Sequence, residues 1–326
     1  MDNLHNISVL AHELSDLELA LLICLGGREH CLIEATEGNI HDVAAELALI
    51  CSHTYDLTYA VVEFSGTTSL EDFRDQVCTH SRSKPGSIAD VVIAKNFDYA
   101  PERIQLEALE LMRSRKLTTC SGVREAPTHF LFVPIIVHDS SQVRPKLNVH
   151  LNDTLFISHF HDSEDGYVYL EDDDWVSEGQ ASMSSVVHRP ITRDSHRTSI
   201  DHELLEALHD ASKTVTATAE LVQYQQDIVV FLRLSRAVAG GISARSSIQF
   251  AKLAKLLAVI HGIDYVTPSI IALAANKVFR HRIVVAKPED DRSLQYGSDL
   301  SAVAKVLEYA TPDTILESVL GLEAPL

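Results

Sequence analysis

The first 160 residues alternate short apolar runs with helical patterns, and this alternation constrains the fold more than any other feature. Two runs are continuously apolar, ADVVIA at 89–94 and FLFVPIIV at 130–137. Strands of this kind are covered on both faces, as in a parallel sheet. Further strands are expected at 30–35, 57–64 and 154–158, and helices at 12–26, 40–53 and 101–116. Strands that alternate with helices predict a doubly wound α/β sheet.

The C-terminal third is helical in pattern, with helices expected at 203–236, 246–261 and 268–280. The last of these begins with Thr267 as cap and Pro268 in the first turn. Between the two halves the chain turns polar and serine-rich. The sequence therefore predicts three parts: an α/β core over 1–160, an acidic, serine-rich linker or insertion over 161–200, and an all-α domain over 201–326.

The net charge and the short apolar runs argue against nucleic acid and membranes as partners. The 27 basic and 46 acidic residues give a formal charge of −19, which repels a phosphate backbone, so no nucleic-acid partner is expected. No stretch approaches the ~20 apolar residues that span a bilayer, and no basic leader opens the chain. Five cysteines without CxxC spacing indicate reduced thiols. We expect a cytoplasmic protein, with the nucleus as the alternative.

The C-terminal third carries the most specific pattern. Residues 241–246 read GISARS, and after a helix residues 261–283 read HGIDYVTPSIIALAANKVFRHRI. This order resembles the small domain of the AAA+ ATPases of the magnesium-chelatase and MoxR group, with G-x-S-P-R-A, a helix, then R-D-Y-V-T-P and V-L-R-H-R. The resemblance extends over roughly residues 12–160. It implies an AAA+ type parallel sheet flanked by helices, followed by a small all-α lid domain.

The resemblance also locates a degenerate phosphate-binding loop. Where the family has H-L-L-L-E-G-P-P-G-T-G-K-T, residues 30–42 read HCLIEATEGNIHD. Gly38 remains, while His41 takes the lysine position and Asp42 the hydroxyl position. In a working loop, glycine N–H groups wrap the phosphates, lysine meets the β- and γ-phosphates, and the hydroxyl holds Mg²⁺. These replacements predict weak ATP binding, because a neutral imidazole replaces an ammonium and acidic groups face a triphosphate.

Three further catalytic positions are replaced in the same alignment. Lys95 stands for the aspartate that helps hold Mg²⁺, and Asn96 for the glutamate that polarises water. Lysine repels a metal ion, and an amide accepts no proton as a general base does. The family's water-positioning asparagine has no counterpart at 134–137, and Thr154 stands for the arginine that acts across a subunit boundary. No Gly-Lys-Ser/Thr occurs anywhere in the chain.

Two remaining features have competing interpretations. Arg245 corresponds to the family's nucleotide-sensing arginine, and the alternative is that it pairs with an acidic residue or caps the preceding turn. His159 and His161 face the same side of a strand, which suggests a zinc site. Because no third ligand is defined, the sequence favours a surface histidine pair instead.

The resemblance and the losses together predict a non-catalytic AAA+ protein that acts as an assembly or regulatory subunit. Its expected partners are proteins, either copies of itself or an active AAA+ relative in a ring in which the lid of one subunit meets the core of the next. No cofactor is assigned, and ATP and Mg²⁺ are expected to bind weakly. The alternative is a magnesium-chelatase-like ATPase that drives metal insertion or partner remodelling. An intermediate case binds nucleotide through Gly38, the following helix N-terminus and Arg245 without turnover.

Overall fold

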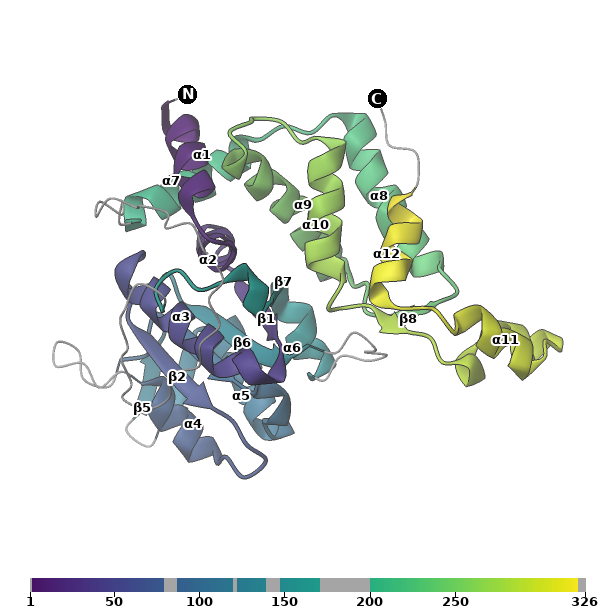
Figure 1. Cartoon of the computed structure of the whole chain (residues 1–326), viewed down its shortest axis with the longest axis horizontal. Coiled ribbons are helices and arrows are strands. Elements are labelled where there is room, and N and C mark those ends of the chain that lie inside the picture. The colour runs from purple at the N-terminus through teal and green to yellow at the C-terminus, as the bar shows by residue number, and fades with distance from the viewer. Residues whose placement is uncertain (1, 79–86, 120–121, 139–146, 171–199, 322–326) are drawn as a thin grey trace, which may run out of the picture.

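The chain folds into an α/β core beside a group of C-terminal helices (Figure 1). The computed structural model describes residues 2–78, 87–119, 122–138, 147–170 and 200–321. Much of the expected linker, 171–199, lies outside these residues. No helix in the described ranges is long and apolar enough to cross a membrane.

The core is built on a five-stranded parallel sheet with the order β2-β3-β6-β1-β7. Its strands are β1 (His30–Ala35), β2 (Tyr59–Glu63), β3 (Val91–Lys95), β6 (Leu131–Val137) and β7 (Leu155–His161). The interior strands β1, β3 and β6 are buried at almost every position. The predicted α/β fold with a parallel sheet is therefore confirmed.

Helices cover both faces of the sheet, because alternate side chains of each strand point into different apolar clusters. Ile33 of β1 packs in a cluster with α2 (Asp16–Gly27), α3 (Ile40–His53) and the C-terminal helices. Leu32 packs in a second cluster with α4 (Leu70–Val77) and α5 (Glu102–Ser114). In the core, the sequence did not predict α4, nor the helices α1 (Asp2–Glu13) and α6 (Val149–Thr154), nor the antiparallel pair β4 (Lys116–Thr119) and β5 (Gly122–Glu125).

The C-terminal region is helical, as predicted. Its helices are α7 (His202–Thr214), α8 (Ala219–Leu234), α9 (Ala244–Ile260), α10 (Pro268–Phe279), α11 (Leu300–Leu307) and α12 (Pro312–Leu320). A small hairpin, β8 (Val238–Gly240) with β9 (Val284–Val285), interrupts them.

The single helix expected over 203–236 is wrong. α7 ends at Thr214, and α8 begins where the Thr218 side chain accepts a hydrogen bond from the Leu221 N–H. Between them Thr216 pairs with Tyr265 in an isolated β-bridge. Three threonines and a valine in TVTAT, residues 214–218, favour this extended connection, because β-branched residues disfavour helix and Thr218 is a good N-cap.

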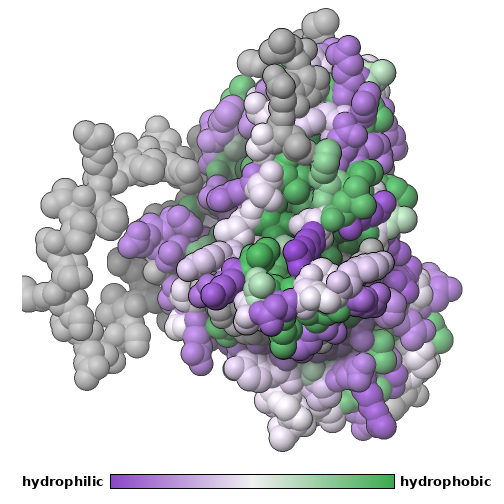
Figure 2. Space-filling view, turned by 90° about the vertical axis from the view of Figure 1, so that its right-hand side faces the viewer, coloured by the Kyte–Doolittle hydropathy of each residue, from purple (hydrophilic) through white to green (hydrophobic). Residues whose placement is uncertain are grey.

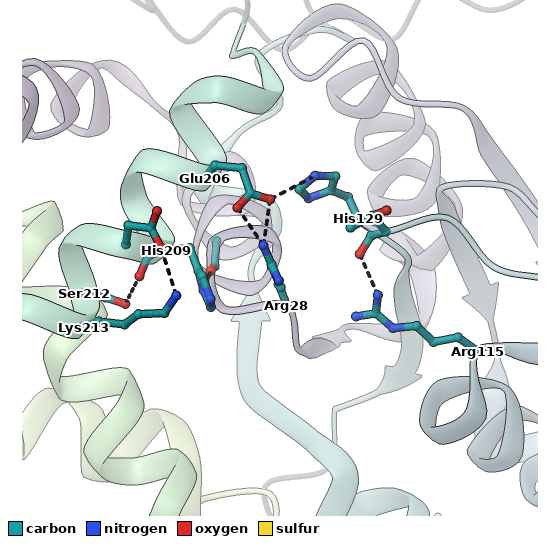
Figure 3. Close-up of polar contacts among 10 residues, drawn as sticks. Arg28, Arg115, His129, Glu206, His209, Ser212 and Lys213 are labelled. Carbon is teal, nitrogen blue, oxygen red and sulfur yellow. Dashed lines mark hydrogen bonds and ion pairs between the residues drawn. The ribbon is translucent and has the colours of Figure 1, made fainter.

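The core and α7 meet through a polar cluster (Figure 3). Arg28 ends α2 in a left-handed conformation and donates to both carboxylate oxygens of Glu206 at 2.8 and 2.6 Å. His129 points at the same carboxylate, 3.6 Å away, and His209 contacts the Gly26 carbonyl at 2.9 Å. Since the Arg28–Glu206 pair is partly exposed, it contributes at most about 1 kcal/mol. Apolar packing of α2 and β7 against α9 and α10 is the larger attachment.

Candidate functional site

The candidate nucleotide site lies at the carboxyl ends of β1, β3 and β6. In open parallel sheets, ligands bind outside the carboxyl ends of the strands, where the strand order reverses. β1 lies between β6 and β7, and the next strand in the chain, β2, lies at the far edge, so the reversal falls at β1. The expected site residues lie after two of these strands. After β1 come Gly38, His41 and Asp42, and at the end of β3 come Lys95, its last residue, and Asn96.

The connection from β1 to α3 closes on itself as a short turn. Glu37–Asn39 form a 3₁₀ turn in which the Asn39 N–H donates to the Thr36 carbonyl at 2.9 Å. Gly38 has open space around its Cβ position and does not have a positive φ, so nothing here requires glycine. Glu37 and Asp42 are both exposed beside the turn. The turn thus presents two carboxylates to solvent, and these would repel a phosphate group.

Lys95 and His41 are brought together, although 54 positions separate them. The Lys95 ammonium lies 3.1 Å from His41 Nδ1 and donates to Glu63 Oε2 at 3.2 Å. Lys95 is 7% exposed, and Glu63 is its register partner on β2. The cation therefore has its own acceptors within the chain. A Mg²⁺ ion at this point would meet a fixed positive charge.

Asn96 has a role in the backbone. Its φ of 54° and ψ of 41° are left-handed, and it opens the 3₁₀ turn Phe97–Tyr99. Asparagine and glycine tolerate this conformation, whereas most residues pay about 1 kcal/mol or more. The asparagine at position 96 is therefore suited to this turn.

The left-handed conformation of Asn96 predicts how its substitutions affect stability. Asn96→Glu, which places the family's acid here, is expected to lower the free energy of unfolding by about 1 kcal/mol because of the left-handed backbone. Asn96→Gly is the matched control and is expected to stay within about 0.5 kcal/mol of wild type. Urea denaturation measures both. Equal stability of the two variants would show that the backbone places no demand on this residue.

Glu34 and His138 form a further polar pair at the same edge, which sequence reasoning missed. Glu34 lies on β1 and is buried, and its Oε2 is 2.6 Å from His138 Nδ1, immediately after β6. The His138 ring also packs on Phe160 with centroids 4.3 Å apart. An acidic residue inside the apolar run HCLIEA was the available signal, because a buried carboxylate needs a partner.

Arg245 lies at the amino ends of the strands, opposite the candidate nucleotide site. Its Nη1 donates to Thr154 Oγ1 at 3.2 Å, and Thr154 immediately precedes β7, whose first residue pairs with His30 at the amino end of β1. The six residues of β1 span about 20 Å, and this length separates the amino ends of the strands from Gly38. Within one chain, Arg245 and the β1–α3 turn therefore face different sides. The Thr154 hydroxyl is neither an acidic partner nor part of the preceding turn, so the contact matches neither local role expected for Arg245.

The other two arginines after α10 are anchors. Arg280 pairs with Asp313 at 3.0 Å. Arg282 is fully buried, and its Nη2 donates to the Leu155 carbonyl and to Gln249. Burial lowers the pKa of Arg282 to about 10. Both contacts tie the C-terminal region to itself or to the start of β7.

His159 and His161 are buried, so the expectation of a surface histidine pair is wrong. They are 8% and 3% exposed, and α10 covers β7 at His159. Burial lowers the pKa of His159 to about 3 and also lowers that of His161. Among the described residues, no group of three histidine, cysteine or acidic side chains is arranged to hold a metal ion.

Comparisons with known proteins match these two parts of the chain. Residues 231–301 match the AAA lid domain family. The whole structure is similar to the crystal structure of a candidate ATPase from Cytophaga hutchinsonii, with a TM-score of 0.67, covering 100% of this chain and 96% of that one at 16% identity. The fold is of the AAA+ type. The sheet is thus the AAA+ core, and the helical region contains the AAA lid.

A curated relative matches part of the chain. Maintenance of telomere capping protein 2 of Lachancea thermotolerans is 30% identical over 115 residues, which cover 34% of this chain and 40% of the relative. The match spans less than half the length of that relative.

Proposed function

We propose that this AAA+ chain is a non-catalytic assembly or regulatory subunit that acts by binding other proteins. The observation that supports it most directly is the buried Lys95 ammonium, bonded to His41 and Glu63 at the carboxyl edge of β3. A nucleotide-bound Mg²⁺ at this edge would have to displace or tolerate that charge. The chain's own side chains satisfy the polar groups there without a ligand.

The neighbouring residues support the same proposal. Glu37 and Asp42 place negative charge beside the turn that would receive phosphates. Asn96 supplies no general base, and losing that group alone costs roughly 10²- to 10⁴-fold in rate. The carboxylates thus disfavour phosphate binding, and Asn96 independently disfavours catalysis.

The surfaces for partner binding are proposed from the positions of Arg245, at the amino ends of the strands, and of the β1–α3 turn, at the carboxyl ends. Because Arg245 and the β1–α3 turn face different sides of one chain, a contact that joins these features requires a second subunit, either a copy of this chain or an active AAA+ relative. The face shown in Figure 2 includes gathered apolar side chains. On α8, the exposed apolar residues are Val222, Val230, Phe231 and Leu234, the last 74% exposed. Exposed apolar groups of this kind are suited to a protein interface.

The experiment is a titration of the purified chain with a fluorescent ATP analogue, with and without Mg²⁺, followed by phosphate release. We expect no Mg²⁺-dependent turnover above that of a double variant, His41→Ala with Arg245→Ala. Turnover that exceeds the double variant would overturn the proposal in favour of the magnesium-chelatase-like ATPase. Saturable binding without turnover would instead support the intermediate case.

Assembly is measured on the same preparation. Light scattering and particle imaging report the mass and the presence of rings, alone and after mixing with an active AAA+ protein. A strictly monomeric chain that captures no AAA+ protein would contradict the assembly role.

Cytoplasmic residence stays a prediction, with the nucleus as the alternative that the relative's name favours, and imaging of a fluorescent fusion tests it.

A further inference from the structure

A pocket of about 200 Å³ lies between the core and the C-terminal helices, away from the candidate nucleotide site. One face of α2 contributes Leu19 and Ile23, α9 contributes Leu253 and Leu257, and β7 contributes Ile157. These residues recur at helical spacing on each helix, so each element presents a single apolar face to the pocket. The volume exceeds the roughly 150 Å³ of an apolar protein cavity that holds benzene.

Two nitrogen groups interrupt this apolar wall. His159, two residues after Ile157 on β7, and Lys277, on α10, both line the pocket, and Lys277 Nζ lies 3.1 Å from His159 Nδ1. Because the ammonium is the donor, Nδ1 accepts and the proton of the neutral ring is on Nε2. His159 Nε2 is buried and has no hydrogen-bond partner within the described ranges. Lys277 Nζ therefore retains donor capacity that the described part of the chain does not use, whereas Nε2 lies on the other side of the ring and has no surface in the pocket.

The ammonium of Lys277 has no directly paired carboxylate among the described residues. Lys277 is partly buried and forms no ion pair with any carboxylate that the structure describes. Burial lowers the pKa of Lys277, while Cys31, Asp16 and Glu34 raise it from longer range. Asp16 also lines the pocket but is exposed. A desolvated cation is costly unless it is paired. One negative charge placed beside Lys277 Nζ would reduce that cost.

We propose that this pocket binds a small organic carboxylate with an apolar body of about the size of benzoate. The carboxylate would accept from Lys277 Nζ, which also contacts His159 Nδ1, and the body would pack against the leucine and isoleucine wall. A phosphate group fits less well, because it carries more charge into a mainly apolar pocket and toward Asp16. Since α2 and β7 belong to the core and α9 and α10 to the helical region, the ligand would contact both.

The test is calorimetric titration of the full chain with sodium benzoate and with benzyl alcohol, a neutral molecule of similar size. Benzoate is expected to bind at least about tenfold more tightly than benzyl alcohol, because a hydrogen bond to a charged group contributes roughly tenfold or more. Lys277→Met keeps most of the side-chain stem and is expected to weaken benzoate at least about tenfold while leaving benzyl alcohol little changed. Lys305→Met, on exposed α11, is the matched control and is expected to bind as wild type does.

A second measurement on the wild-type chain does not depend on any variant folding. The nitrogen resonance of His159 Nδ1, which accepts from Lys277 Nζ, is assigned with His159→Gln and is expected to shift as benzoate is added and to stay in place with benzyl alcohol. Equal binding of the two molecules, no binding of benzoate, an unmoved His159 resonance, or a folded Lys277→Met that binds benzoate as wild type does would each overturn the proposal.

Discussion

Replacing Glu46 with alanine is expected to lower the free energy of unfolding by about 2 kcal/mol or more, since one buried and two partly buried N–H donors lose their acceptor and a buried donor left unpaired costs roughly 1 to 3 kcal/mol. Glu46 lies on α3 and is 1% exposed. Its Oε1 accepts from the N–H groups of Val168 and Tyr169 at 2.9 and 3.0 Å, and its Oε2 accepts from that of Leu170 at 3.0 Å. Alanine removes the acceptor of three consecutive backbone donors.

The same carboxylate fixes the segment that follows β7 to the core. Burial raises the pKa of Glu46, and the three N–H groups oppose that shift, so the fold uses them to hold a buried charge. Chemical denaturation measures the loss. Asp42→Ala, at the exposed first turn of the same helix, is the control and is expected to cost at most about 1 kcal/mol through the helix dipole. If Glu46→Ala cost no more than Asp42→Ala, the segment would be held by other contacts.

The sheet was predictable because its signal is local. A strand covered on both faces is apolar at successive positions, and both VVIA, at 91–94 after Asp90, and FLFVPIIV meet that condition. The structure extends the first of these strands to Lys95, a charged residue that the apolar rule excludes. Lys95 is accommodated by His41 and Glu63, which come from other elements. A single sequence does not show which distant residues will meet.

Burial of the histidines on β7 was hidden for the same reason. HFH, at 159–161, precedes a polar stretch and reads as the end of a strand at the surface. The structure covers His159 with α10, and Lys277 of that helix contacts the ring. The contact joins residues 118 positions apart, so only tertiary packing determines it. Arg245 is a similar case, since its side of the sheet depends on where the lid docks.

Replacing Gly241 with alanine is expected to lower the free energy of unfolding by about 3 kcal/mol, as the sum of a left-handed backbone and overpacking. Gly241 has a φ of 98°, and a Cβ there would lie 1.7 Å from the carbonyl oxygen of Arg282. That neighbour is backbone, and the Arg282 side chain also donates to the Leu155 carbonyl of the core. The clash therefore strains the lid turn and its attachment to the core together.

Gly240→Ala is the matched control, because no atom lies within 4 Å of its Cβ position and its φ is not positive. Denaturant unfolding of both variants is expected to separate them by about 2 kcal/mol or more. Equal stability would contradict the steric account. The comparison also bears on function, because Gly241 begins the G-x-S turn on which the resemblance to ATPases rests. If packing against Arg282 alone requires that glycine, its presence is explained without a bound nucleotide, and the turn gives no support to ATP hydrolysis.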